Sequence, residues 1–288
     1  MVTDSSVKKP LRSILVYDSS TRSWLATLAE TWDFRETIGL LVYQRLAIRY
    51  RRSILGFMWA FLNPLIQITV IAVVFGLIFH ETTNNLRDDI TANFAYVATG
   101  LLPWQFFQGQ VSGLSSVFIN AESMIKKVYL PMLIFPVSQI VAGMLDLCFA
   151  LLAMCLLFVV LGNEIKPTTP LVLPGILLLA VFTLGITLFV SVTNVYFRDF
   201  GFIVGVMLQL WFYATPILWP WNKIPQQFAW IFKANPFWNF LLFFRAVLQD
   251  GTVPSPDIWL KCVLWATAAF VFGFAIYRGV ERKMIFRL

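Results

Sequence analysis

Six long apolar runs constrain this chain more than any other feature of its sequence. An α-helix needs about 20 consecutive apolar residues to cross the hydrocarbon of a bilayer. Because backbone groups in hydrocarbon must find their hydrogen bonds within the segment, uninterrupted runs of this length predict helices. We therefore predict transmembrane spans at 55–79, 94–118, 133–161, 171–196, 201–220 and 257–279.

Composition supports an integral membrane protein. Of the 288 residues, 59% are hydrophobic and only 13% are charged, and the mean hydropathy is +0.75. A soluble domain is closer to half apolar and a quarter charged, and it could not hide this much apolar surface from water. The net charge of +7 does not indicate nucleic-acid binding, because the basic residues gather at the ends of the apolar runs.

Lysine and arginine predict the orientation of the chain. With the N-terminus in the cytoplasm, sixteen of the 22 basic residues fall on the inner side, and six fall outside or in the sixth span. Because cytoplasmic loops carry the excess of basic residues, both termini are expected inside. The predicted parts are a cytoplasmic tail (1–21), an interface helix (22–53), a six-helix transmembrane domain (54–279) and a second cytoplasmic tail (280–288).

Residues 22–53 predict an amphipathic helix at the membrane surface. Apolar residues recur there with a rough period of 3.6, and Arg45, Arg49 and Arg52 lie at i, i+4 and i+7 along one edge. Such a helix lies in the headgroup plane with its arginines toward the phosphates. A basic flank that only sets the topology is the alternative interpretation. Asn63-Pro64 follows inside the first span, which the proline is expected to bend.

Two connecting segments are also informative. Residues 119–131 lie inside and are long enough for one short helix across the membrane face, although a solvated connector is an alternative. Residues 219–251 are very apolar but are cut by three prolines into pieces too short to cross. One more span there would place the basic C-terminus outside. We therefore predict two re-entrant helices on the periplasmic side within 221–250, beside a pore or its outer gate.

Aromatic residues make up 16% of the chain, which includes 11 Trp and 28 Phe. Aromatic faces stack on the C–H surfaces of sugar rings without requiring charge, so some of them are candidates to line a carbohydrate conduit. Lipid-facing packing is the alternative for each one. The candidates within or at the ends of spans are Trp59, Phe61, Trp104, Phe106, Phe107, Trp211, Phe212 and Tyr213.

The sequence lacks the patterns of an enzyme or a metal site. Three cysteines at 148, 155 and 262 and a single histidine, His80, have no ligand spacing, so no metal and no cofactor are expected in this chain. None of the nine lysines follows a glycine, which excludes a phosphate-binding loop, and no G-x-S-x-G motif occurs. Asp146, near the centre of the third span, is either a functional acid or a neutral group that stabilises helix packing.

Six stretches of this sequence resemble those of one known protein family. The chain resembles the membrane subunits of polysaccharide-export ABC transporters, the ABC-2 type group that includes the Wzm, TarG and capsule-exporter permeases. The matching stretches occur in order from residue 48: IRYRRSILGFMWAFLNPLIQ (48–67), TGLLPWQFFQG (99–109), NAESMIKKVYLP (120–131), NVYFRDF (194–200), WFYATPILWP (211–220) and NPFWNFLLFFRAVLQDG (235–251). The N-terminal 40 residues match poorly.

The resemblance implies a half-transporter in the bacterial inner membrane that pairs with a second copy of itself. Two separate ABC ATPase subunits would bind ATP and magnesium, and the cargo would be lipid-linked polysaccharide. The resemblance also implies that 119–131 is a coupling helix, with Glu122, Lys126, Lys127 and Tyr129 at the ATPase contact. The inner arginines would attract a lipid pyrophosphate, at about 1 kcal/mol per basic residue; they are Arg45, Arg49, Arg51 and Arg52.

Two other functions stay open on the sequence. One is a proton-driven flippase of lipid-linked sugars, with Asp146 as the proton relay. The other is an integral-membrane enzyme of lipid-linked glycan assembly, although the carboxylate clusters of such enzymes are missing. The identity of the glycan, such as O antigen, capsule or teichoic acid, is not encoded in any of these patterns.

Overall fold

The computed structural model describes residues 23–50, 56–78, 86–160, 164–218, 227 and 229–287. Every regular element in these ranges is helical, which confirms the prediction of an all-α protein. The first helices are α1 (Trp24–Asp33), α2 (Arg35–Tyr50), α3 (Trp59–Ile78), α4 (Leu86–Gly113), α5 (Val117–Asn120) and α6 (Glu122–Ile125). They are followed by α7 (Ile134–Val160), α8 (Val172–Tyr196), α9 (Phe200–Tyr213), α10 (Ala229–Lys233), α11 (Pro236–Arg245) and α12 (Pro256–Ile285).

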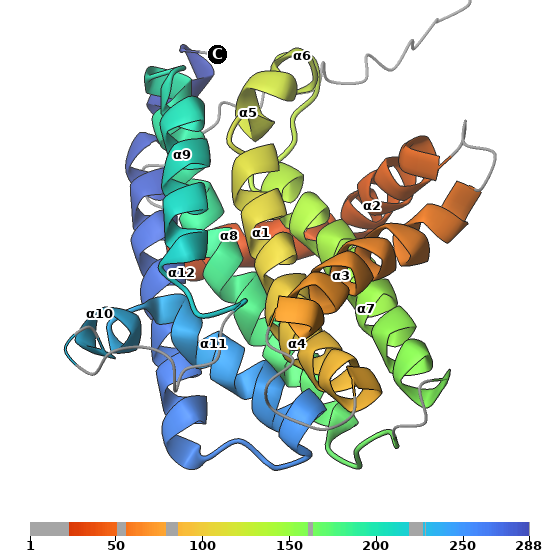
Figure 1. Cartoon of the computed structure of the whole chain (residues 1–288). Helices are drawn as coiled ribbons and strands as arrows, with labels where there is room; N and C mark the ends of the chain where they lie inside the picture. The colour runs from red at the N-terminus through yellow and green to blue at the C-terminus, as the bar shows by residue number, and fades with distance from the viewer. Residues whose placement is uncertain are drawn as a thin grey trace, which may run out of the picture.

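Three helical segments among the described residues are long and apolar enough to cross a membrane. They are Ile134–Val160, Thr169–Tyr196 and Pro256–Glu281, and they correspond to α7, to α8 with the 3-10 turn before it, and to most of α12. Shorter apolar helical stretches occur at Phe61–Ile71 and Phe200–Tyr213. The short helices α5 and α6 lie at the same end of the bundle as the C-terminus, and α10 and α11 lie toward the opposite end (Figure 1).

The most extensive helix packing among the described residues is between α8 and α12. Gly185 of α8 and Gly273 of α12 face each other, and a Cβ added to Gly273 would overlap the carbonyl oxygen of Gly185 and lie 3.1 Å from its Cα. Small residues allow membrane helices to approach in this way. The contact places α8 in the centre of the bundle, where it is more enclosed than α7 or α12.

The segment predicted as one interface helix at 22–53 contains two helices, because α1 ends at Asp33 and α2 begins at Arg35. No glycine or proline marks this break. Trp24 packs edge-on against Phe274 of α12, with ring centroids 5.4 Å apart, and α2 packs against α7. Several large apolar side chains stay exposed, so the segment presents an apolar face while it is anchored to the bundle; they include Leu25, Trp32, Leu40 and Tyr43. Residues 22 and 51–53 lie outside the described ranges.

The helix in the fifth predicted span, 201–220, is shorter than expected. α9 has 14 residues, which at 1.5 Å per residue gives about 21 Å, less than the roughly 30 Å of hydrocarbon. The helix ends at Tyr213 because Pro216 follows, lacks an N–H and disfavours helical geometry at Thr215. The helix in the second predicted span, 94–118, is displaced toward the N-terminus, because α4 begins at Leu86 and ends at Gly113. Residues 219–220 are not among those described.

The segment predicted to hold re-entrant helices contains α10 with 5 residues, α11 with 10 residues and a π-helical turn at Ala246–Asp250. None of them is long enough to cross a bilayer. Thr168 supports the π-helical turn by donating its hydroxyl to the carbonyl of Val247 at 2.7 Å. Gly251, with φ of 66°, ends the turn in the left-handed conformation that glycine adopts without strain.

Candidate functional site

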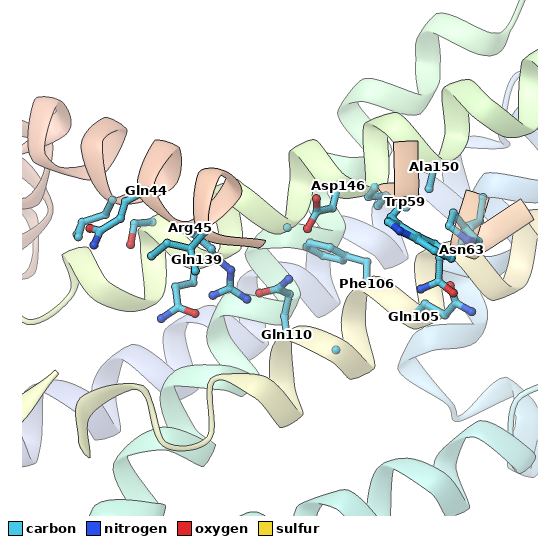
Figure 2. Close-up of a pocket in the computed structure, with 18 of the residues that line it drawn as sticks. Gln44, Arg45, Trp59, Asn63, Gln105, Phe106, Gln110, Gln139, Asp146 and Ala150 are labelled. Atoms are coloured by element: carbon cyan, nitrogen blue, oxygen red, sulfur yellow. The ribbon is translucent and has the colours of Figure 1, made fainter. Parts of the chain in front are cut away.

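A cavity with a volume of about 680 Å³ lies between α2, α3, α4 and α7. We call it the amide cavity, because five primary amides line it. Figure 2 shows Arg45, Gln139 and Gln110 converging at one end and Trp59, Asn63 and Gln105 gathered at the other. Asp146 and Phe106 lie between these two groups. The remaining polar side chains of the lining are Gln44 and Ser138.

The polar side chains of the cavity lie along one face of each helix because of their spacing in the sequence. On α7, Gln139, Gly143 and Asp146 are spaced at i, i+4 and i+7, which places them along one face. On α4, Gln105 and Gly109 are four residues apart and contribute the opposite wall. The cavity is therefore built where polar faces of otherwise apolar helices meet.

Gln110 is the most buried amide of the cavity wall, with only 7% of its surface exposed. Its Oε1 has no hydrogen-bond partner among the described residues. Gly143 makes room for it, because a Cβ at position 143 would overlap Nε2 of Gln110 and lie 3.2 Å from the ring of Phe106. The amide is thus held at the wall with part of its hydrogen-bonding capacity unused.

A second polar feature lies on the exposed face of α3. Gln67 donates through Nε2 to Oδ1 of Asn63 at 3.1 Å, and Gln105 of α4 donates through Nε2 to Oε1 of Gln67 at 2.6 Å. We call this chain of hydrogen bonds the amide ladder. It continues the polar lining of the amide cavity onto the outer surface of the protomer, on a helix whose other residues are mostly apolar.

The predicted conduit residues fall into two groups. Trp59 and Tyr213 are open to the surroundings, with 44% and 55% of their surfaces exposed. Phe61 is partly buried and packs on Phe149 of α7, with ring centroids 5.8 Å apart. In this protomer, therefore, Trp59 and Tyr213 are the two predicted conduit residues with large exposed surfaces.

Most of the remaining aromatic candidates form a packed cluster. Trp104 and Phe107 of α4 are buried and surround Phe237 of α11, with the Trp104 and Phe237 centroids 4.9 Å apart. Trp211 and Phe212 of α9 join this cluster through Phe107 and Trp104. Phe106 is also buried and reaches the amide cavity. Their role in the protomer is to join α4, α9 and α11.

Of the four predicted headgroup arginines, Arg45 lines the amide cavity. The side chain of Arg49 and all of Arg51 and Arg52 lie outside what the structure describes. Arg45 is therefore the one predicted headgroup residue whose side chain the structure describes, and it belongs to the lining of the amide cavity.

The predicted coupling residues lie at the end of the bundle that holds α5 and α6. Lys126 forms an ion pair with Glu122 at 2.6 Å, and Lys127 is exposed. The hydroxyl of Tyr129 donates to Oε1 of Glu30 at 2.7 Å, which ties this segment to α1. Phe118 of α5 stacks on Tyr277 of α12, and both rings are fully buried. This end of the bundle is thus linked to α1 through Tyr129 and to α12 through Phe118.

Sequence reasoning missed two residues that hold the end of α9 against α11. Asn235 donates through Nδ2 to Oγ1 of Thr215 at 2.7 Å and accepts from Nε1 of Trp211 at 2.8 Å. Arg245, at the other end of α11, donates through Nη2 to the carbonyls of Pro216 at 2.9 Å and Ile217 at 3.3 Å. We call Asn235 and Arg245 the outer clasp. The sequence does show an arginine, Arg245, within an apolar segment, which could have indicated a structural role. Its partners could not be identified from the sequence, because they lie about thirty positions earlier in the chain.

We expect Arg245→Met to lower the stability of the protein by about 2–3 kcal/mol, because two buried carbonyls lose a charged donor. The variant also loses the stacking of the guanidinium over Tyr96, which lies 3.7 Å from the ring centroid. Thermal unfolding in lipid nanodiscs measures the change. Lys261→Met, which removes an exposed ion pair with Asp257, is the matched control and is expected to cost less than about 1 kcal/mol. Equal unfolding temperatures for the two variants would contradict the role of the outer clasp.

No group of three or more His, Cys, Asp or Glu side chains is placed to hold a metal ion in the described ranges of the chain. The polar groups gathered in the amide cavity are mainly amides, which are donors and acceptors of hydrogen bonds but are not nucleophiles or proton carriers. The arrangement is suited to hydrogen bonding with hydroxylated molecules.

Comparisons with known proteins identify the family of this chain. The family model of the ABC-2 type transporter matches residues 36–248. An O-antigen export system permease protein, RfbA, of Myxococcus xanthus is 31% identical over 250 residues, which cover 83% of this chain and 93% of that protein. The RfbA permease of Klebsiella pneumoniae is 32% identical over 83% of this chain and 89% of its own length. The polysialic acid transport protein KpsM of Escherichia coli is 25% identical over 86% of this chain and 95% of its own. This helical membrane chain therefore belongs to the ABC-2 type transporter family, as a transporter membrane subunit.

Proposed function

We propose that two copies of this chain form the permease of an ATP-driven exporter that moves lipid-linked polysaccharide outward across the bacterial inner membrane. The names of its relatives, which are O-antigen export permeases and a polysialic acid transport protein, support the substrate class. ATP and magnesium are bound by two separate ATPase subunits. The chain itself is a transport subunit and not an enzyme.

The proposed topology has six spans with both termini in the cytoplasm. The grouping of α5, α6 and the C-terminus at one end, away from α10 and α11, supports it (Figure 1). In this topology α10 and α11 are re-entrant helices on the outer side, and α9 completes the fifth span with the chain that follows it. Residues 1–21 and 280–288 form the cytoplasmic tails.

The observation that carries this function is the amide ladder on α3. Polar side chains within membrane helices face the interior of a bundle or a water-filled space, because lipid offers them no hydrogen bonds. Asn63, Gln67 and Trp59 are exposed on the single protomer. We infer that this face of α3 meets the second copy around a hydrated conduit, with Tyr213 of α9 on the same wall.

The double variant Trp59→Ala/Tyr213→Ala is expected to slow polymer export by about five- to tenfold, because two stacking surfaces for sugar rings are lost. Basal ATP hydrolysis by the assembled complex should stay largely intact. Export is measured as polymer that reaches the cell surface per unit time. Trp265→Ala/Phe272→Ala, which removes two exposed aromatics from α12, is the matched control. Normal export in the first variant would exclude these residues from the conduit.

The inner arginines are proposed to recruit the lipid pyrophosphate. Replacing Arg49, Arg51 and Arg52 by Gln removes three charges, each worth about 1 kcal/mol near the surface, so export is expected to fall about tenfold or more. Membrane insertion should persist, since other basic residues hold the topology. A cysteine-accessibility assay that shows inversion of the first span would indicate that the arginines only set the topology.

Deleting the gene tests the function directly, because the cells should then keep their polymer inside and regain surface polymer with a plasmid copy.

A proton-driven flippase is the alternative, since Asp146 lies at the amide cavity with Arg45. Transport into inverted vesicles separates the two. The exporter works with ATP present and the proton gradient collapsed, whereas the flippase stops.

A further inference from the structure

The amide cavity lies toward the end of the bundle that holds α5 and α6. On α7 its lining extends from Phe135 to Ala150, close to the start of that helix at Ile134. On α4 it extends from Leu102 to Gln110, close to the end at Gly113. Both of these helix ends adjoin α5 and α6. In the proposed topology this end is cytoplasmic, so the cavity lies on the side from which an exported molecule enters, beside α2.

The chemistry of the wall is that of a site for neutral, hydroxylated molecules. Primary amides donate and accept hydrogen bonds at the same time, as sugar hydroxyls do. Arg45 and Asp146 are one charge of each sign, so the lining as a whole does not favour an anion or a cation. Trp59 and Phe106 supply aromatic surface beside the amides. A volume of about 680 Å³ lies within the range of small-molecule sites.

Gln110 points to a ligand independently of the cavity shape. A buried amide oxygen without a partner is unfavourable, and native structures rarely leave one in that state. The side chain could not occupy this position with any residue larger than glycine at 143. Sequence and packing thus keep an incompletely bonded amide at the cavity wall.

We propose that the amide cavity of each protomer binds one or two neutral sugar residues of the exported glycan before they enter the conduit between the two copies. Gln110, Gln139 and Gln105 are the specificity-determining amides, and Gly143 is the positioning residue that allows Gln110 its place. This proposal rests on the proposed function, and it adds a recognition site inside each protomer.

Thiol protection tests the proposal in the full chain with its partner ATPase. Gly109 lines the cavity and has nothing within 4 Å of an added Cβ, so Gly109→Cys fits without displacing a neighbour. Inverted membrane vesicles are treated with 2-aminoethyl methanethiosulfonate. The labelling of the parent chain, which has three cysteines of its own, is subtracted as background. We expect modification to be about tenfold slower in vesicles from cells that make the lipid-linked glycan than in vesicles from cells lacking its first sugar transferase. Equal rates with and without glycan, or no reaction in either, would overturn the proposal.

Gly143→Ala supplies the second test, because it displaces Gln110 without removing any polar group. We expect it to abolish the protection of Gly109→Cys by glycan and to reduce export about tenfold. Gly113→Ala is the matched control, because Gly113 lies on α4 with Gly109 and Gln110 and has nothing within 4 Å of an added Cβ; it should leave both protection and export unchanged. Protection that persists in Gly143→Ala overturns the role of Gln110. A gene deletion that leaves surface polymer normal rejects the proposed function, whatever the labelling shows.

Discussion

Gly273→Val is expected to prevent this protein from accumulating as a folded membrane protein, which is the largest effect of any single substitution considered. A side chain at 273 would enter the backbone of α8, where the carbonyl carbon of Gly185 lies 2.8 Å from the added Cβ. Backbone atoms cannot rotate away as a flexible side chain can, so α8 and α12 have to separate along their length. Even Gly273→Ala should cost about 1–3 kcal/mol, the range for inserting one methyl group into a packed interior.

Gly279→Ala is the matched control for this experiment. It lies on the same helix, six positions further on, and nothing is found within 4 Å of its added Cβ. Detergent-solubilised protein is compared by size-exclusion chromatography and thermal unfolding. We expect Gly279→Ala to elute and unfold as the parent protein does and Gly273→Val to aggregate. A monodisperse Gly273→Val protein with the parental unfolding temperature would refute the close contact of α8 with α12.

Lys126→Glu/Lys127→Glu is expected to reduce export to about one hundredth while ATP hydrolysis continues, because reversing two charges at the proposed ATPase-docking surface would cost several kcal/mol. The exposed Lys127 and the Glu122–Lys126 ion pair give this segment its charge pattern. Its mechanical links are already present in the protomer, through Tyr129 to Glu30 and through Phe118 to Tyr277. These contacts are the route by which we expect a displacement of the segment to reach α1 and α12.

The control for this uncoupling is Lys283→Glu/Arg287→Glu, which changes the charge by the same amount near the C-terminal end of α12, at the end of the bundle that also holds α5 and α6. Both side chains are exposed. Export of polymer and release of phosphate are measured together in vesicles that contain the assembled complex. Normal export in the Lys126→Glu/Lys127→Glu variant would remove 119–131 from the coupling role. Equal losses in the two variants would show a general effect of charge.

The amino-acid sequence alone determined the helical and membrane-embedded character of this protein. Length and hydropathy are local properties, and a run such as 133–161 differs by only one residue at each end from α7, Ile134–Val160. The motifs between residues 48 and 251 also placed the chain in its family, which the match to residues 36–248 shows. The three prolines in 219–251 predicted short helices, and the helices among the described residues of this segment, α10 and α11, are too short to cross a membrane.

Only the tertiary structure decided which side chains face one another. In a membrane helix both the lipid-facing and the protein-facing sides are apolar, so the sequence has no polarity difference from which to read the inward face. Trp104 and Phe107 therefore looked equal to Trp59 as conduit candidates, although they are buried against Phe237 while Trp59 is exposed. The same limit hid the approach of Gly185 to Gly273 and the bonds from Arg245 to the end of α9. The amide cavity is the clearest case, because its wall joins residues from Leu41 to Ala150 on four helices, and only their packing brings those amides together.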